Sequence, residues 1–175
     1  MAAFFCYCAL ESTAGLWASS YLVMEHGVSK ETAAGLATLF YTGITVGRGI
    51  SGFVTYKLSD KNMIRLGQII IAVGISLIII PLGEKTAMAG IVLVGFGCAP
   101  IYPCVIHSTP AHFGVDKSQA IVGVQMACAY IGSCFMPPLF GILANHISAG
   151  LLPFYLGAIL VMMFAAMEKL NKIKA

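Results

Sequence analysis

Six long apolar stretches, separated by short polar segments, make up most of this chain of 175 residues. A transmembrane helix needs about 20 apolar residues, so each stretch is long enough to cross a membrane. The stretches are too long and too rich in glycine for core strands, and they lack the alternation of a membrane barrel. We therefore expect an all-α membrane protein with six transmembrane helices, placed at about 3–24, 33–57, 63–83, 86–108, 118–144 and 150–167.

The composition excludes a water-soluble enzyme. Hydrophobic residues make up 59% of the chain and charged residues 10%, whereas soluble domains carry about 25% charged residues. Six helices with short loops occupy residues 1–175 and leave no room for an extramembrane domain, so we expect a single transmembrane unit. The net charge of +3 is small and its basic residues are scattered, which does not favour a nucleic-acid partner.

The six cysteines all fall inside apolar runs. They form no Cys-x-x-Cys pair and have no histidine at metal-ligand spacing, so we expect packing roles and neither a metal nor a cofactor.

The basic residues at the helix ends predict the orientation of the chain. With six helices, both termini lie on one side of the membrane, together with the loops 58–62 and 109–117. That side carries seven basic residues, which are Lys57, Lys61, Arg65, Lys117, Lys169, Lys172 and Lys174. The other side carries Lys30 and Lys85. By the positive-inside rule, both termini of this multi-pass protein of the cell membrane are expected in the cytoplasm.

Polarity divides the six spans into two kinds. The third span (63–83) and the sixth (150–167) have almost no polar side chains between their ends. The other four carry charges, amides, tyrosines and clustered glycines. Every third helix is thus lipid-like, a pattern that predicts a 3+3 inverted repeat of the kind common in transporters.

Glu11 and Arg48 are the acidic and the basic residue that lie deep inside spans. A charge in hydrocarbon costs several kcal/mol unless it is neutralised, paired or hydrated, so both are functional candidates. At 1.5 Å per residue they lie about 12 Å and about 13 Å from the cytoplasmic ends of their helices, which predicts a shared layer. An alternative stays open for each residue. Glu11 could be protonated and make only structural hydrogen bonds, and the Arg48 side chain could extend to the lipid headgroups on the cytoplasmic side.

Other polar side chains in the spans suit contact with a solute. Trp17 shares a helix with Glu11, Tyr102 lies in the fourth span and Gln125 in the fifth. A glutamine donates and accepts hydrogen bonds, which suits a polyhydroxylated ligand, and a structural bond between helices is an equal alternative for Gln125.

Two proline pairs predict interruptions of helices. Pro100 and Pro103 should break or bend the fourth span, because proline lacks the backbone donor, and broken helices in transporters expose carbonyl groups at the binding site. Pro137-Pro138 predicts a second kink in the fifth span.

The segment Gly49-Ile50-Ser51-Gly52 resembles the nucleophile motif of rhomboid intramembrane proteases. A serine nucleophile needs a base at its own depth. All four histidines, which are His26, His107, His112 and His146, lie at span ends or in loops. The protease is therefore the minor alternative, and a purely structural membrane subunit is a third.

Three short segments carry a resemblance to a known family. They are Phe5-Cys6-Tyr7-Cys8-Ala9-Leu10-Glu11 in the first span, Val46-Gly47-Arg48-x-x-x-Gly52 in the second, and Ile101-Tyr102-Pro103 in the fourth. In this order and spacing, the chain resembles the C-terminal half of a major facilitator superfamily transporter, and most of all the fucose permease branch of sugar–proton symporters. Tyr56 stands where that superfamily often has an aspartate in its loop motif, which puts the usual charge relay there in doubt.

The resemblance implies a function and a site. The function is secondary active transport of a small polar solute, a sugar moved with protons, by alternating access, and not enzymatic catalysis. The resemblance implies that spans one and four line a central cavity, two and five face the other half, and three and six face lipid. The expected solute-binding residues are Glu11, Trp17, Tyr102 and Gln125, and the residues expected to shape the interface between the halves or to pair charges are Arg48, Gly47 and Gly52.

The resemblance also implies a partner. The acidic residues taken to couple protons in that branch lie mainly in the N-terminal half, so we expect this six-helix half to pair with a missing N-terminal half or with a second six-helix chain. An efflux carrier for amphipathic compounds is the alternative within transport.

Overall fold

The computed structural model is an all-helical bundle and describes residues 1–80 and 82–173. Pro81 in the third expected span and Lys174 of the basic cluster lie outside the described residues, as does the side chain of His112. The elements of the described part are α1 (Ala2–His26), α2 (Lys30–Val54), α3 (Asp60–Ile79), α4 (Glu84–Cys98), α5 (Ile101–Phe113), α6 (Val115–His146), the short 3-10 helix η1 (Ala149–Leu151) and α7 (Leu152–Ile173).

The expected break in the fourth span is present. This span divides into α4 and α5 at Ala99-Pro100. Pro100 has no N–H to continue the ladder, and the carbonyl of Phe96 instead accepts from Ala99 N at 3.3 Å, the tighter bonding of a helix end. Pro103 lies in the first turn of α5, where a missing donor is tolerated.

At the second proline pair, for which a kink was predicted, α6 runs as one helix through Pro137 and Pro138. Neighbouring helices bond to the backbone there. Trp17 Nε1 of α1 donates to the carbonyl of Pro137, and Tyr155 Oη of α7 donates to that of Met136, each at 3.0 Å.

Four segments are long and apolar enough to cross a membrane: Asp60–Ile79, Glu84–Ala111, Lys117–His146 and Ala149–Lys172. Helices α1 and α2 have 25 residues each, but they are the more polar ones and carry Glu11 and Arg48. The expectation of six spanning helices is therefore confirmed for four of them.

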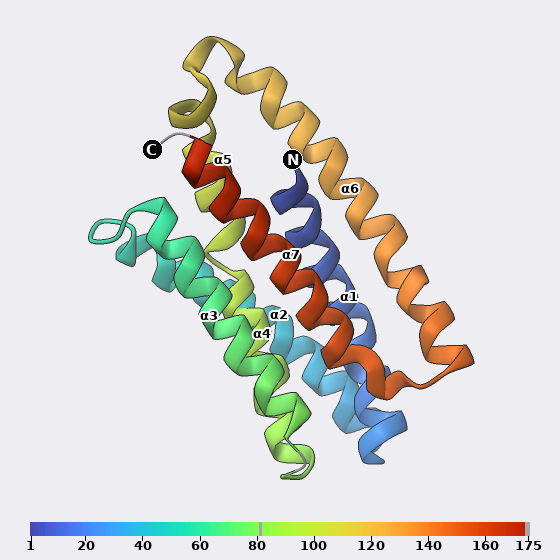
Figure 1. The fold of residues 1–175 in the computed structure, drawn as a ribbon. Helices are drawn as coiled ribbons and strands as arrows, with labels where there is room; N and C mark the ends of the chain where they lie inside the picture. The colour runs from blue at the N-terminus through green and yellow to red at the C-terminus, as the bar shows by residue number, and fades with distance from the viewer. Residues whose placement is uncertain (81, 174–175) are drawn as a thin grey trace.

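α1 lies at the centre of the bundle, in contact with α2, α4, α6 and α7. Figure 1 shows α6 along one side of the molecule, α3 and α4 along the other, and both termini near the same end. The core follows α1, where Phe4, Tyr7 and Leu10 are buried.

Glycines bring α3 and α4 into close contact. A Cβ added at Gly67 would lie 2.6 Å from the carbonyl oxygen of Gly97, and one at Gly90 would lie 2.6 Å from that of Gly74. The two backbones touch at both levels, as small residues in membrane helices permit.

Ion pairs hold the end of the bundle that carries the termini. Arg65 Nε and Nη2 of α3 donate to Glu168 Oε1 of α7 at 2.9 Å and 2.6 Å. One turn earlier on α3, Asp60 Oδ2 lies 2.7 Å from His107 Nδ1 of α5. These two pairs attach α7 and α5 to the start of α3.

Candidate functional site

The structure brings Glu11 and Arg48 together. Glu11 Oε1 of α1 lies 3.9 Å from Arg48 Nη2 of α2, and the two side chains are 23% and 50% exposed. Counting residues along the two helices predicted that both lie in one layer of the bundle. In the structure each side chain compensates the charge of the other. The exposed parts of the two side chains leave them open to a further ligand.

Aromatic side chains surround this pair on one side. Tyr7, one helical turn before Glu11, is fully buried, and its hydroxyl has no hydrogen-bond partner among the described residues. The ring of Tyr102 lies 6.2 Å from that of Tyr7 and 5.1 Å from that of Phe4. The break before α5 therefore positions Tyr102 against the buried aromatic residues of α1.

A cleft of about 630 Å³ opens beside Arg48, between α2, the start of α3, and α5. Tyr102 lines it, as do Ser51 and Thr55 from α2 and the turn that follows. The Asp60–His107 pair also lines this cleft. The cleft thus offers a cation, hydroxyl groups and an aromatic ring to a polar molecule.

Trp17 lies apart from this cleft. Its indole N–H donates to the carbonyl of Pro137 at 3.0 Å, and its ring packs edge-on against Phe140, 5.2 Å between centroids. These contacts attach α1 to α6, and they already use the donor that Trp17 would offer to a solute.

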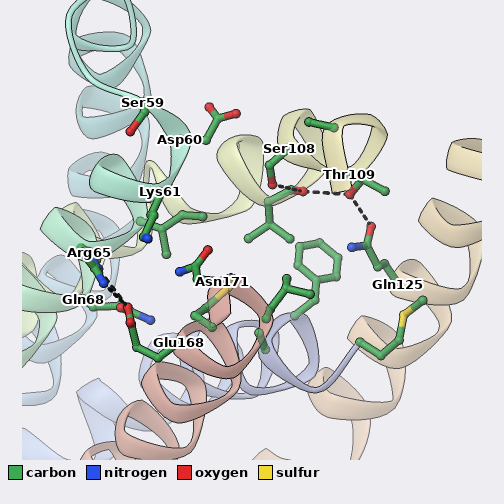
Figure 2. Close-up of a pocket in the computed structure, with 18 of the residues that line it drawn as sticks. Ser59, Asp60, Lys61, Arg65, Gln68, Ser108, Thr109, Gln125, Glu168 and Asn171 are labelled. Carbon is green, nitrogen blue, oxygen red and sulfur yellow. Dashed lines mark hydrogen bonds and ion pairs between the residues drawn. The ribbon is translucent and has the colours of Figure 1, made fainter. Parts of the chain in front are cut away.

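Gln125 lines a different cavity, of about 230 Å³, at the end of the bundle that holds the termini (Figure 2). It is buried, and its Oε1 accepts a hydrogen bond from Thr109 Oγ1 at 3.2 Å. The structural bond between helices, one of the two expectations for this residue, is thus present. Of the four expected solute-binding residues, Glu11 and Tyr102 lie near Arg48, and Trp17 and Gln125 lie elsewhere.

The two glycines assigned to the interface between the halves differ in position. Gly47 is buried against α4, where an added Cβ would lie 2.6 Å from the Cβ of Ala99 and 3.1 Å from the carbonyl oxygen of Phe96. It therefore packs two helices of this chain together. Gly52 lies on the exposed face of α2, with nothing within 4 Å of an added Cβ.

Sequence reasoning missed the Asp60–His107 pair and its nearness to Ser51. Both lie at span ends, but the helices bring them to one cleft. Ser51 Oγ donates to the carbonyl of Arg48 at 3.0 Å and makes no hydrogen bond to His107 in the described part of the chain. The three residues share a cleft without the contact that would activate the serine.

Within the described residues there is no group of three or more His, Cys, Asp or Glu side chains placed to hold a metal ion.

The chain matches a family model and a curated relative. The model described as Major Facilitator Superfamily matches residues 1–170. The relative is Bypass of stop codon protein 6 of Saccharomyces cerevisiae, 29% identical over 167 residues. The match covers 85% of this chain and 32% of the relative, so the chain spans about a third of the relative's length. With its helices of membrane-spanning length, the chain therefore belongs to the major facilitator superfamily, whose members are multi-pass transporters of small molecules.

Proposed function

We propose that this chain is the six-helix C-terminal half of a secondary active transporter for a small polar solute, a sugar, by alternating access. The observation that carries the proposal is the Glu11–Arg48 pair, 3.9 Å apart and partly exposed beside a cleft. Paired charges kept at this depth mark solute or ion pathways in membrane proteins. Tyr102 adds an aromatic face to the same site, and protons are the proposed coupled ion.

The proposed architecture is a 3+3 repeat, with α1 to α3 as one unit and α4 to α7 as the other. The broken α4–α5 pair counts as one span in this arrangement. Two observations support it: α1 and α2 carry the charged pair, and the lipid-like α3 and α7 carry their ion pair at the end of the bundle.

The exposed face of α2 is the proposed contact with the other half, an N-terminal half or a second six-helix chain. Phe53, next to the exposed Gly52, and Tyr56, in the turn that follows α2, are 78% and 90% exposed. Large apolar groups exposed together mark a surface that is covered in the assembled protein or by lipid.

Cysteine labelling tests the topology. In a chain whose own six cysteines are replaced, cysteines at Lys61 and Lys172 should react with an impermeant thiol reagent from the cytoplasm. Cysteines at Lys30 and Lys85 should react from outside, because α1, α2 and α3 each cross the membrane in the proposed arrangement. Labelling of all four from one side would reject it.

Uptake of sugars tests the function and separates it from the protease alternative. Proteoliposomes with the complete two-half transporter should accumulate a radiolabelled hexose. Ser51→Ala should not abolish this uptake, because Ser51 is one of several polar residues of the cleft and its Oγ bonds its own helix. Cleavage of a transmembrane substrate that Ser51→Ala abolishes would instead support the protease. Movement of an amphipathic dye without that of any hexose would favour the efflux carrier.

A further inference from the structure

The cavity that Gln125 lines lies inside this half of the transporter, away from the Glu11–Arg48 pair. Its walls come from α1, α3, α5, α6 and α7 (Figure 2). Of the described lining residues, Asp60 is shared with the cleft beside Arg48. The cavity is therefore a second, separate space.

Gln68 of α3 lines this cavity with unmet hydrogen-bonding groups. The residue is 4% exposed, and neither Nε2 nor Oε1 of its side chain has a partner among the described residues. A buried amide without partners is strongly unfavourable unless a bound molecule supplies them. The residue lines the cavity, and both its donor and its acceptor are left unmet there.

Two further carboxamides reach the same space from other helices. Gln125 is 5% exposed and points inward from α6, as Figure 2 shows. Thr109 donates a hydrogen bond to its oxygen, and the residue lines the cavity. Asn171, near the end of α7, is the third. Each of these groups can bond a hydroxyl group as donor or acceptor.

The charges of the wall are largely compensated. Arg65 is bonded to Glu168, and Asp60 to His107, while Lys61 is exposed at the rim. Phe4 and Met167 add apolar side chains to the lining. A lining of carboxamides and apolar side chains complements an uncharged molecule that has both hydroxyl groups and a C–H face.

We propose that this cavity binds a small, uncharged, polyhydroxylated molecule, held by Gln68, Gln125 and Asn171, at a site distinct from the Glu11–Arg48 cleft. The site is independent of the proposed solute pathway, because Gln68 and Gln125 line the cavity whether or not the cleft binds solute.

Equilibrium binding of tritiated xylitol and of tritiated glucose to the purified full chain in lipid nanodiscs tests the proposal. At least one of the two should bind, and Gln68→Leu and Gln125→Leu should each weaken that binding by at least about fivefold, as the loss of a buried hydrogen-bond partner does. Gln119→Leu is the matched control, since Gln119 is exposed on the same helix as Gln125, and it should not change the affinity.

Two further variants keep the test decisive. Glu11→Ala should leave intact the share of the binding that Gln68→Leu removes, so a failure of the proposed transport site is distinguishable from a failure of this one. Asn171→Ala, on the rim, should also weaken binding and replaces the core variants if they fail to fold. Binding of neither probe, or binding that all three carboxamide variants retain, would overturn the proposal and leave a cavity that holds water alone.

Discussion

Replacing Glu11 by alanine in the complete two-half transporter is expected to weaken solute binding by about 5- to 150-fold, the usual effect of losing one buried hydrogen-bond partner. Glu11→Gln keeps the shape and much of the hydrogen bonding, so it should retain measurable binding while losing the titratable proton. Calorimetric titration of the purified wild type and variants with the transported sugar measures both effects.

Arg48→Ala should act differently, because it removes the partner of Glu11 at 3.9 Å and the cationic wall of the cleft. We expect it to slow transport or weaken assembly more than it weakens binding. Glu84→Ala is the matched control, since Glu84 is exposed at the start of α4, and its affinity should equal that of the wild type. Unchanged affinity in Glu11→Ala would make Glu11 a structural residue and move the solute away from this pair.

Replacing Gly90 by alanine is expected to destabilise the fold by about 1–3 kcal/mol, the usual cost of overpacking a core. The new Cβ would lie 2.6 Å from the carbonyl oxygen of Gly74 and 3.1 Å from the backbone nitrogen of Ile78. Backbone atoms cannot rotate away, so α3 and α4 must separate. The melting temperature, followed by size-exclusion chromatography in detergent, should fall.

Gly157→Ala is the matched control in α7, because an added Cβ there meets nothing within 4 Å. Alanine is favoured over glycine in a helix by about 0.5–1 kcal/mol, so this variant should melt at the wild-type temperature or above it. The opposite directions of the two changes separate packing from helix propensity. A melting temperature that rises in Gly90→Ala would show that α3 and α4 do not touch at this level.

Local features of the chain predicted the helices well. The third span begins at Asp60 where it was expected near residue 63, and the break at Pro100 follows from a missing backbone donor. Pro137 and Pro138, for which a kink was predicted, do not divide α6, and Trp17 and Tyr155 from neighbouring helices bond to its backbone at this level.

The candidate site was predicted in part. The shared layer of Glu11 and Arg48 followed from their depth, because depth depends only on counting residues along each helix. Which residues face the same cavity depends on the rotation and neighbours of each helix, which counting does not provide. Trp17 therefore faces α6 and Gly47 faces α4. Gln125 shares a cavity with Gln68, which nothing in the sequence marked as a candidate binding residue.

The sequence by itself determined that this chain is a helical membrane protein, where its helices lie and which of them are polar, because length, apolar content and proline act over a few turns of one helix. Only the tertiary structure decided that Ser51 shares a cleft with the Asp60–His107 pair, and that Gln68 is buried without a hydrogen-bond partner among the described residues. Those arrangements depend on contacts between helices far apart in the chain, such as the touching backbones at Gly74 and Gly90. Such contacts follow from the fit of whole helix surfaces, which no local pattern of residues encodes.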